Sequence, residues 1–495
     1  MPTIEKLTRR AVVGSCLSLL ATAAVAHASD LEHLLPLESL LPFQDRRLPS
    51  DPALQQLWDT TAHQAFSFFW EETSPITGLT KDRAHNGLDA APDAYNVASI
   101  ASTGYMLSAL VIGVERGWID PSSAMARALL TLRFVGSKME HQHGFYYHFI
   151  DLHSGKRVWK CELSSIDTGL LILGALTAGQ YFGGEVAERA QALYARIDWQ
   201  WMQARKHNDA ADIPLRMGWK PESGFLDARW KEYDEASFLY LLALGAPKHA
   251  LPGSAWDKWG TGDSLLEGVR IPGRPGPLFW AQMTPGYYDL HGLQDRSNRD
   301  WWKLWGNTHQ AHYNYCAHHP KLYPHHQETL WGINACDQPP AKPGVSNGYG
   351  AQNPIDGEND GTIAPTAALA AITFLPEIAD RTLQDLSSVY RAKAWGKYGF
   401  ANAINPTRDW FDTDVIGIDL GMMLLAIENH RSGLLWRLTS AQPATMKALK
   451  SAGFHKAGRQ ELRSQRQHIL STREPIDCAD TAGRRCTTSP GYPNA

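Results

Sequence analysis

The sequence predicts an all-α protein that folds as an (α/α)6 toroid, with six inner and six outer helices and long loops over one face. Six apolar runs of helical length recur along the chain, and several are apolar around most of the helix, which is typical of helices buried on all sides. More amphipathic, polar segments fall between or before these runs. Strand signals are few, the best being "GFYYHFID" followed by the turn "HSGK".

Each apolar run has a small or polar opening followed by an apolar stretch. In chain order they are "NVASIASTGYMLSALVIG" from Asn96, "SSIDTGLLILGALTAG" from Ser164, "EYDEASFLYLLALG" from Glu232, "THQAHYNYC" from Thr308, "IAPTAALAAITFL" from Ile363 and "IDLGMMLLAIEN" from Ile418. The amphipathic segments include residues 55–71, 122–137, 184–204 and 378–394. A repeat solenoid is the alternative, but irregular spacing and long interrupting loops favour a closed ring. Residues 270–360, rich in Gly, Pro, His and Trp, are expected to form the long loops.

The composition is that of a globular protein. The chain has 495 residues, of which 43% are hydrophobic and 20% charged, so it can bury a large core in one big domain or two ordinary ones. Its formal net charge is only -4, and no basic face suited to nucleic acid is visible. A nucleic-acid partner is therefore not expected.

The amino-terminal segment indicates export. A basic start is followed by an apolar stretch from Ala11 to Ala26 and a small-residue cleavage pattern, as in a signal peptide. The paired Arg9 and Arg10 make twin-arginine export plausible, although ordinary secretory signals also carry two arginines. A membrane anchor is the competing interpretation, but the stretch is short and no other run approaches the ~20 residues needed to span a bilayer. We expect a periplasmic or secreted protein without stable membrane insertion.

The predicted domain organisation has three parts. Residues 1–28 form the export signal, residues 29–440 the (α/α)6 domain, and residues 441–495 a polar tail with a helix or two. Within the tail, Cys478 and Cys486 can form a disulfide in an oxidising compartment. None of the five mature cysteines has the CxxC spacing of a zinc site, so a structural metal is not expected.

Acidic residues open three of the predicted inner helices. In an alternating toroid all inner helices run in one direction, so their amino-terminal ends meet at one rim of the central cavity. Carboxylates there would converge: Asp167, the group Glu232, Asp234 and Glu235, and Asp419, with Glu162 just before the first of them.

These acids also have a purely structural interpretation. First-turn carboxylates complement the helix dipole, and "SSID" matches a capping box, so for Asp167 structure and function are equally favoured. Glu235 is different, because Phe238, Leu239 and Leu242 at i+3, i+4 and i+7 place it on an apolar face. Lost solvation there would raise its pKa, as a general acid near neutral pH requires.

Most enzymes that break a glycosidic bond use two carboxyl groups that face a cavity. Trp is abundant, and aromatic rings on loops suit the faces of sugar rings. The substrate-binding candidates are Trp301 and Trp302 in the long-loop region and Trp410 in another loop, although several of the 18 Trp residues must serve packing. Scattered histidines, among them His148 and the pair His325 and His326, are interpreted as ordinary loop residues. The acids of "DGENDG", Glu358 and Asp360, are expected to line the cleft.

Six stretches together resemble the bacterial glycoamylase-like domain family, which includes endo-β-1,2-glucanases. They are "GFYYHFIDLHSGKR", "ELSSIDTGLLILGAL", "GFLDARWKEYDEASFLYLLALGAP", "DGTIAPTAALAAITFLPE", "WGKYGFANAIN" and "VIGIDLGMMLLAIENHRSGLLW", spanning about residues 75–436 in the family order. The resemblance implies an (α/α)6 fold and an exported glycoside hydrolase without organic cofactor, inverting where the mechanism is known.

The resemblance also implies roles for particular residues. The glutamate of "Y-x-E-A" corresponds to Glu235, the essential acid, and the aspartate of "G-I-D-x-G" to Asp419, a candidate base. Glu162 and Asp167 correspond to the acids of "E-L-S-x-I-D-T", which bind substrate or act as catalytic partners. Asp151, in the first matching stretch, is a further substrate-binding candidate. The family commonly has Asn where this chain has Asp234, which leaves the sugar linkage open.

The functional prediction is an inverting endo-β-1,2-glucanase acting on an oligo- or polysaccharide. Glu235 is the general acid, and Asp419 or Asp167 places the water. The alternatives are a glycosidase on another glucan linkage, a non-catalytic glucan-binding protein on the same toroid, and a polysaccharide lyase, for which the acidic chain lacks the expected basic groove.

Overall fold

The computed structural model describes residues 49, 51–88, 94–206, 209–210, 212–260, 262–323, 330–340, 348–355 and 359–457. The described residues up to His455 belong to one compact unit. The predicted export signal, the Cys478–Cys486 disulfide, His325, His326 and Glu358 lie outside the described residues, so they stay predictions. In the described ranges, no helix has the length and apolarity needed to cross a membrane.

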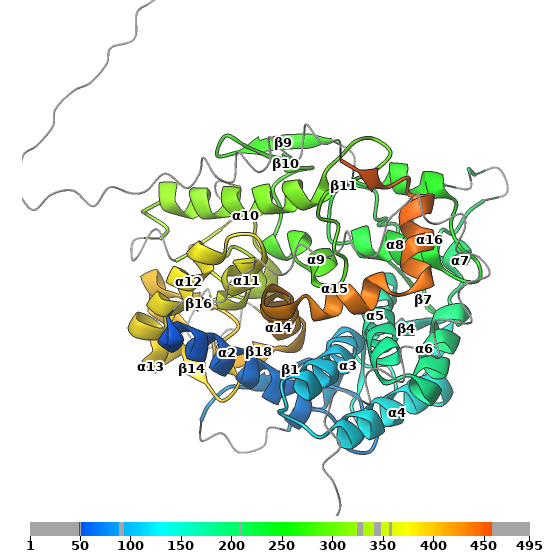
Figure 1. Cartoon of the computed structure of the whole chain (residues 1–495), viewed down its shortest axis with the longest axis horizontal. Coiled ribbons are helices and arrows are strands. Elements are labelled where there is room, and N and C mark those ends of the chain that lie inside the picture. Colours follow the sequence, from blue (N-terminus) through cyan, green and yellow to red (C-terminus); the bar gives the residue numbers. More distant parts are fainter. Residues whose placement is uncertain are drawn as a thin grey trace, which may run out of the picture. The chain divides into compact units, whose positions relative to one another are not determined.

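One set of helices is buried on almost all sides. It comprises α3 (Ile100–Glu115), α5 (Ser165–Phe182), α8 (Ser237–Gly245), α9 (Met283–Tyr287), α11 (Pro365–Ala370) and α14 (Gly417–Ser432). They contact one another in a closed sequence, from α14 to α3, α5, α8, α9 and back to α14, while α11 packs on α14. Figure 1 shows α3, α5, α9, α11 and α14 towards the middle of the fold.

A second set of helices buries only one face. It comprises α2 (Pro52–Glu71), α4 (Pro121–Ser137), α6 (Gly184–Arg196), α10 (Trp301–His318), α12 (Pro376–Asp385), α15 (Leu434–Ser440) and α16 (Pro443–Ser451). In α6 the buried residues are Val186, Ala190, Leu193 and Tyr194, a single helical stripe. Figure 1 shows α2, α4, α6, α10 and α12 towards the periphery. The predicted alternation of buried and half-exposed helices is thus present along most of the described chain.

Shorter helical pieces connect these elements. They are α7 (Trp199–Met202), α13 (Arg391–Ala394), four 3-10 helices (Gly253–Lys258, Leu278–Ala281, Ala371–Thr373 and Pro406–Arg408) and a π-helix (Leu386–Tyr390). The close packing of α3 on α5 depends on two glycines: a Cβ on Gly104 would lie 2.4 Å from the backbone oxygen of Leu170, and one on Gly174 would lie 1.9 Å from that of Gly104. The two helix backbones therefore touch directly.

Short strands are more numerous than the sequence suggests. One five-stranded sheet has the order β3 (His141–Gln142), β4 (Phe145–Tyr147), β6 (Leu163–Ser164), β7 (Gly218–Lys220), β8 (Gly224–Phe225). Antiparallel two-stranded pairs are β1 (Arg83–His85) with β18 (Asp414–Ile416), β2 (Val97–Ser99) with β5 (Phe149–Asp151), β9 (Asp263–Leu266) with β10 (Val269–Pro272), β12 (Ala335–Asp337) with β13 (Tyr349–Ala351), β14 (Trp395–Gly396) with β15 (Gly399–Phe400), and β16 (Ile404–Asn405) with β17 (Trp410–Phe411). Two further two-residue strands are β11 (Leu293–Gln294) and β19 (His455–Lys456).

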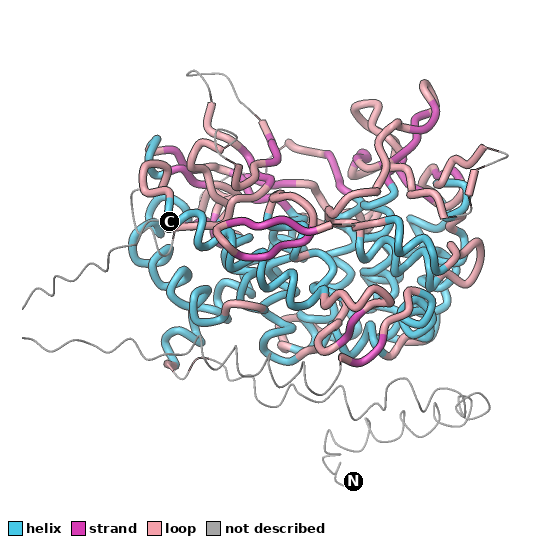
Figure 2. The backbone as a smooth tube through the Cα atoms, turned by 90° about the horizontal axis from the view of Figure 1, so that it is seen from above, coloured by secondary structure: helices cyan, strands magenta, loops and turns pink. Residues whose placement is uncertain are grey.

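Three of these strands run directly into buried helices. β2 ends at Ser99 and α3 begins at Ile100, β6 is followed at once by α5, and β18 by α14. Strand pairing therefore holds the amino-terminal ends of three buried helices in place. Figure 2 shows most strands and loops gathered on one side of the helices.

The fourth predicted inner helix is misplaced. α10 begins at Trp301, earlier than Thr308, and buries one face only. The short α9 is instead buried at every position, and none of the six apolar runs predicted it. The prediction was wrong here because a five-residue helix is too short to show a periodic pattern.

Trp301 and Trp302 are corrected by the same observation, because both lie in the first turn of α10 rather than in a loop. Trp301 is 1% exposed, and its Nε1 donates a hydrogen bond to Asp295 at 2.8 Å. Trp302 is partly buried and packs on Phe374 and Trp436. Both contribute to the core.

We expect Trp301→Ala to lower the free energy of unfolding by about 3–5 kcal/mol, because it removes a large buried side chain and leaves a cavity. Urea denaturation measures the change. The matched control is Trp159→Ala, since Trp159 is 63% exposed and a surface substitution costs about 0.5 kcal/mol or less. Equal losses in the two variants would contradict the assignment of Trp301 to the core.

Candidate active site

A pocket of about 1030 Å³ lies at the amino-terminal ends of the buried helices. Its wall includes Ser99, the residue that caps α3, Asp167 in the first turn of α5, and Asp419 in the first turn of α14. Glu235, two residues before α8 begins, lines the same pocket. The structure therefore brings together the three carboxylates that the sequence singles out as candidate catalytic groups.

Glu235 lies before helix α8 rather than on its apolar face as expected, because the helix begins only at Ser237. Its side chain is partly exposed, at the pocket. Burial, together with the nearby charges of Asp234 and Asp167, raises the pKa of Glu235 well above its usual range. The pKa of Glu235 is thus raised, as expected. The carboxyl group is buried by the residues around the pocket, however, and not by an apolar face of its own helix.

Asp234, the residue before Glu235, is buried and hydrogen-bonded. It accepts hydrogen bonds from Nε1 of Trp259 and the backbone N–H of Ala236, both at 2.9 Å. Burial raises the pKa of Asp234 to about 7. By contrast, Glu232 is exposed and does not line the pocket.

Asp167 takes part in a helix cap and also lines the pocket. The Ser164 hydroxyl accepts from the backbone N–H of Asp167 at 3.2 Å, as in the predicted capping box, and donates to the Asp167 carboxylate at 2.5 Å. The same carboxylate lines the pocket, and its Oδ2 lies 3.5 Å from Nε2 of His148. A helix cap therefore holds this acid at the pocket wall.

His148 bridges two of the predicted acids. Its Nδ1 lies 3.1 Å from Oε1 of Glu162, while its Nε2 faces Asp167. Burial opposes a charge on the ring, but the two carboxylates outweigh it and raise the pKa of His148 to about 8. The hydrogen bond with His148 in turn lowers the pKa of Glu162. His148 does lie in the connection between β4 and β5, as expected, but it also lines the pocket and contacts two of the predicted site acids.

Asp419 is 2% exposed. Its Oδ2 accepts a hydrogen bond from Nδ2 of Asn402 at 2.6 Å, and Oδ1 of Asn402 accepts from the backbone N–H of Asp337 at 2.9 Å. Burial raises the pKa of Asp419 to about 8, and the charges of Asp337 and Asp82 act in the same direction.

A second acidic group, which sequence reasoning missed, shares the pocket with Asp419. Arg83 donates two hydrogen bonds to Asp337, at 2.8 and 3.3 Å, and lies 3.4 Å from Asp82 and 3.7 Å from Asp414. These side chains come from β1, β12 and β18 or their borders, so segments far apart in sequence supply them. The one available signal was the pair of acids in "DTD", Asp412 and Asp414, a few residues before the predicted inner helix that starts at Ile418.

Asp412, beside this group, links stability to pH. Burial, and then the charge of Asp337, raises the pKa of Asp412 from 3.8 to about 8. A carboxyl group with a raised folded pKa stabilises the fold fully below its unfolded pKa and loses that contribution as pH rises through the folded pKa. We expect the melting temperature of the wild type to fall more steeply between about pH 4 and pH 8 than that of Asp412→Asn, which cannot ionise.

Thermal melts across this pH range measure the difference, with Asp227→Asn, at an exposed position, as the control. Parallel curves for wild type and Asp412→Asn would contradict the assigned cause.

The aromatic wall of the pocket differs from the expected one. Trp410, on β17, lines the pocket as predicted for a substrate-binding candidate. Phe149, Trp159 and Tyr349 also line it, and none of them was predicted. Of the other predicted substrate-binding residues, Glu162, Trp301, Trp302 and Asp151 do not line it. Asp151 instead accepts hydrogen bonds from the backbone N–H and hydroxyl of Ser154, at 2.7 and 2.6 Å, within a turn.

The described pocket wall is strongly acidic. Its carboxyl groups are those of Asp82, Asp167, Glu235, Asp337, Asp412, Asp414 and Asp419, and its basic side chains are Arg83 and His148. Within the described ranges, no three His, Cys, Asp or Glu side chains are placed to hold a metal ion. Burial raises the pKa of several of these carboxyl groups. A pocket with several carboxyl groups can supply both a proton donor and a proton acceptor.

Comparison with known proteins agrees with this chemistry. The family model Glycoamylase, described as "Putative glucoamylase", matches residues 227–443. An exo β-1,2-glucooligosaccharide sophorohydrolase (non-reducing end) of Parabacteroides distasonis is 27% identical over 440 residues, which cover 80% of this chain. The matched region covers only 57% of that relative's length.

Solved structures match over more of their own length. A protein of Bacteroides caccae described as a glucoamylase is 28% identical, with a TM-score of 0.73, covering 82% of this chain and 100% of that one. An endo-β-1,2-glucanase of Chitinophaga pinensis, in complex with sophorotriose and glucose, is 27% identical with a TM-score of 0.72, covering 81% and 99%. The resemblance to the glycoamylase-like family that the sequence motifs predict is thus confirmed.

Proposed function

We propose that this protein is a glycoside hydrolase that cleaves β-1,2-linked glucan by endo action with inversion, on an (α/α)6 ring of six inner and six outer helices. The observation that carries the proposal is the meeting of Glu235, Asp167 and Asp419 in one pocket. The relatives support the substrate, since two of them are named for activity on β-1,2-linked glucans or glucooligosaccharides. A periplasmic or secreted location is part of the proposal and depends on the export signal.

In the proposed reaction Glu235 is the general acid. Its raised pKa favours the protonated carboxyl group, which can donate that proton to the glycosidic oxygen as the bond to the anomeric carbon breaks. Asp419 or Asp167 accepts a proton from water, whose oxygen attacks the anomeric carbon from the opposite face. The products are two shorter saccharides, one with a new reducing end, and the acid and base are restored by proton exchange with solvent.

The charge of the pocket supports an uncharged sugar. A polymer of uronates would meet seven carboxyl groups against Arg83 and His148 among the described lining residues, and those of the seven that are ionised would repel it. Neutral hydroxyl groups can instead donate hydrogen bonds to carboxylates. The volume, near the upper end of the range for small-molecule pockets, suits a stretch of oligosaccharide.

Product analysis of linear β-1,2-glucan by NMR tests linkage, cleavage mode and anomeric outcome together. We expect oligosaccharides of mixed length, released first as the anomer opposite to the bond cleaved. Release of sophorose alone would overturn endo action in favour of the exo mode named for the Parabacteroides relative. Products only from another glucan would overturn the substrate, and no product from any glucan would overturn the enzyme class.

A further inference from the structure

Trp159 is exposed at the pocket in a way that packing does not explain. It is 63% exposed and lines the pocket. It and the next residue, Lys160, both have left-handed backbone conformations, with φ of 52° and 50°. Such conformations are unfavourable for residues other than Gly and persist where the surroundings enforce them. The chain therefore holds a large apolar ring in solvent with a strained backbone.

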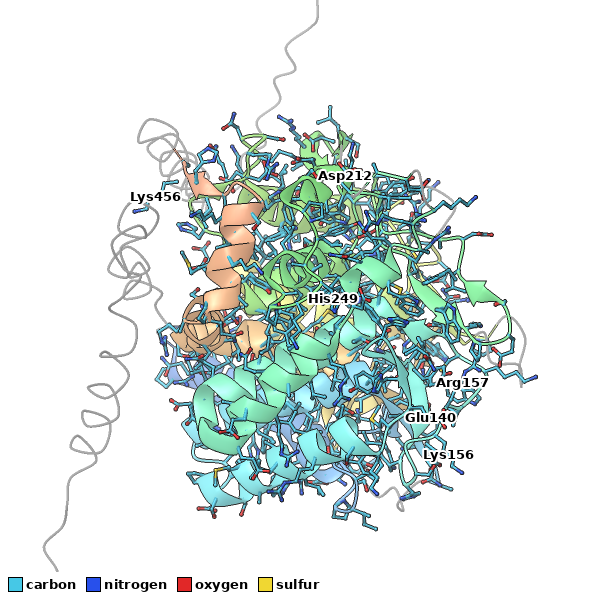
Figure 3. The ribbon with its side chains drawn as sticks, turned by 90° about the vertical axis from the view of Figure 1, so that its right-hand side faces the viewer. Glu140, Lys156, Arg157, Asp212, His249 and Lys456 are labelled. Atoms are coloured by element: carbon cyan, nitrogen blue, oxygen red, sulfur yellow. The ribbon has the colours of Figure 1, made fainter. Side chains whose placement is uncertain are left out.

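The loop on which Trp159 lies is anchored on both sides. Before it, Arg157 pairs with Glu222 at 2.6 and 3.0 Å and donates to the backbone oxygen of Cys161. The backbone N–H of Val158 donates to the oxygen of Phe149 at 3.1 Å, and that of Cys161 donates to the oxygen of Val158 at 3.1 Å. Figure 3 shows Lys156 and Arg157 close together on one side of the fold. These bonds fix the backbone of the loop, so the position of Trp159 at the pocket is fixed as well.

An aromatic path connects Trp159 to the candidate catalytic carboxylates. His148, which faces Asp167, stacks on Phe149 with ring centroids 3.8 Å apart. Phe149 in turn meets Trp159 edge-on, with centroids 5.1 Å apart. All three rings line the pocket. The path thus begins at Asp167 and ends at an exposed indole.

We propose that Trp159 is an outer sugar-binding platform of this pocket, on which a glucosyl ring beyond those held at the carboxylates stacks its apolar face. An indole has a large flat apolar surface that loses solvent when a pyranose ring covers it. Phe149 bridges the platform and the inner part of the pocket. This inference rests on the proposed function, because it takes the ligand to be a neutral glucan chain, and it makes Trp159 a determinant of chain-length preference.

Calorimetric titration with β-1,2-glucooligosaccharides of increasing length tests the platform in a Glu235→Gln background, where cleavage is blocked. We expect Trp159→Ala to weaken binding of long oligosaccharides by about ten-fold, the loss expected for one aromatic stacking contact. The loss should shrink for oligosaccharides too short to reach the loop. Trp159→Phe, which keeps a ring, should restore most of the affinity.

Lys156→Ala is the matched control, since Lys156 is exposed on the same loop and does not line the pocket. It should bind as the background does. An unchanged affinity of Trp159→Ala for every length, or an equal loss at every length, would overturn the platform while leaving the proposed function intact. Failure of the Glu235→Gln background itself to bind any β-1,2-glucooligosaccharide would overturn the proposed function instead.

Discussion

Glu235→Gln is expected to lower the rate of β-1,2-glucan hydrolysis by roughly 10²–10⁴-fold, the usual contribution of a general acid. The amide has nearly the size of the carboxyl group but cannot donate a proton to the leaving oxygen. Initial rates of reducing-sugar release measure the effect. The control is Glu232→Gln, three residues away and exposed, which should keep nearly the rate of the wild type.

The fold of the Glu235→Gln variant should be intact. Burial disfavours the ionised form of Glu235, so ionisation of this group lowers the free energy of unfolding at high pH. A neutral amide at this position cannot ionise and avoids that loss. We expect a melting temperature at or above that of the wild type at about pH 8. A rate within about three-fold of the wild type would show that another group is the acid, whereas lost activity with a lowered melting temperature would indicate a structural role.

The convergence of carboxylates could be predicted from the sequence because it depends on local features. Asp167 and Asp419 lie in first turns of strongly apolar helices, and Glu235 directly precedes another. Once the helices are buried side by side in one direction, their leading residues must meet at one end. Periodicity and helix position were enough for this part of the site.

The opposite wall of the pocket could not be predicted in this way. Asp82 and Arg83, at β1, and Asp414, on β18, meet because two three-residue strands pair across more than 300 positions of sequence, as Arg83 does with Ile416. Asp337 comes from a third short strand, β12, which pairs with β13. Strands so short have no period to detect. Trp159 was missed for a related reason, since its exposure follows from a loop anchored by Arg157 and Glu222, which are distant in sequence.

The tryptophans show where composition misleads. Trp301 and Trp302 were interpreted as loop residues, although with Trp305 they have the i, i+1, i+4 spacing that also fits a helix. Trp301 and Trp305 are fully buried in α10. The number of aromatic residues does not indicate whether each ring lies in the core or at a binding site. Only Trp410, of the three predicted binding tryptophans, lines the pocket.

Asp419→Asn is expected to reduce hydrolysis by roughly 10²-fold or more, if Asp419 accepts the proton from the attacking water. The substitution keeps an oxygen that can accept from Asn402, so packing around α14 should persist. Because the pKa of Asp419 is raised to about 8, the ionised base becomes more abundant as pH rises toward 8. We therefore expect kcat/KM of the wild type to increase across the neutral range, and Asp419→Asn to lose that increase.

Asp167→Asn separates the two candidate bases. Asp167 is tied to Ser164 and faces His148, so its removal also disturbs the helix cap and the bridge to Glu162. If Asp419 is the base, the double variant Glu235→Gln/Asp419→Asn should lose little more activity than either single variant, since acid and base act as one unit. If most of the activity survives in Asp419→Asn and is lost in Asp167→Asn, Asp167 is the base, and Asp419 serves the hydrogen-bond chain through Asn402 to Asp337.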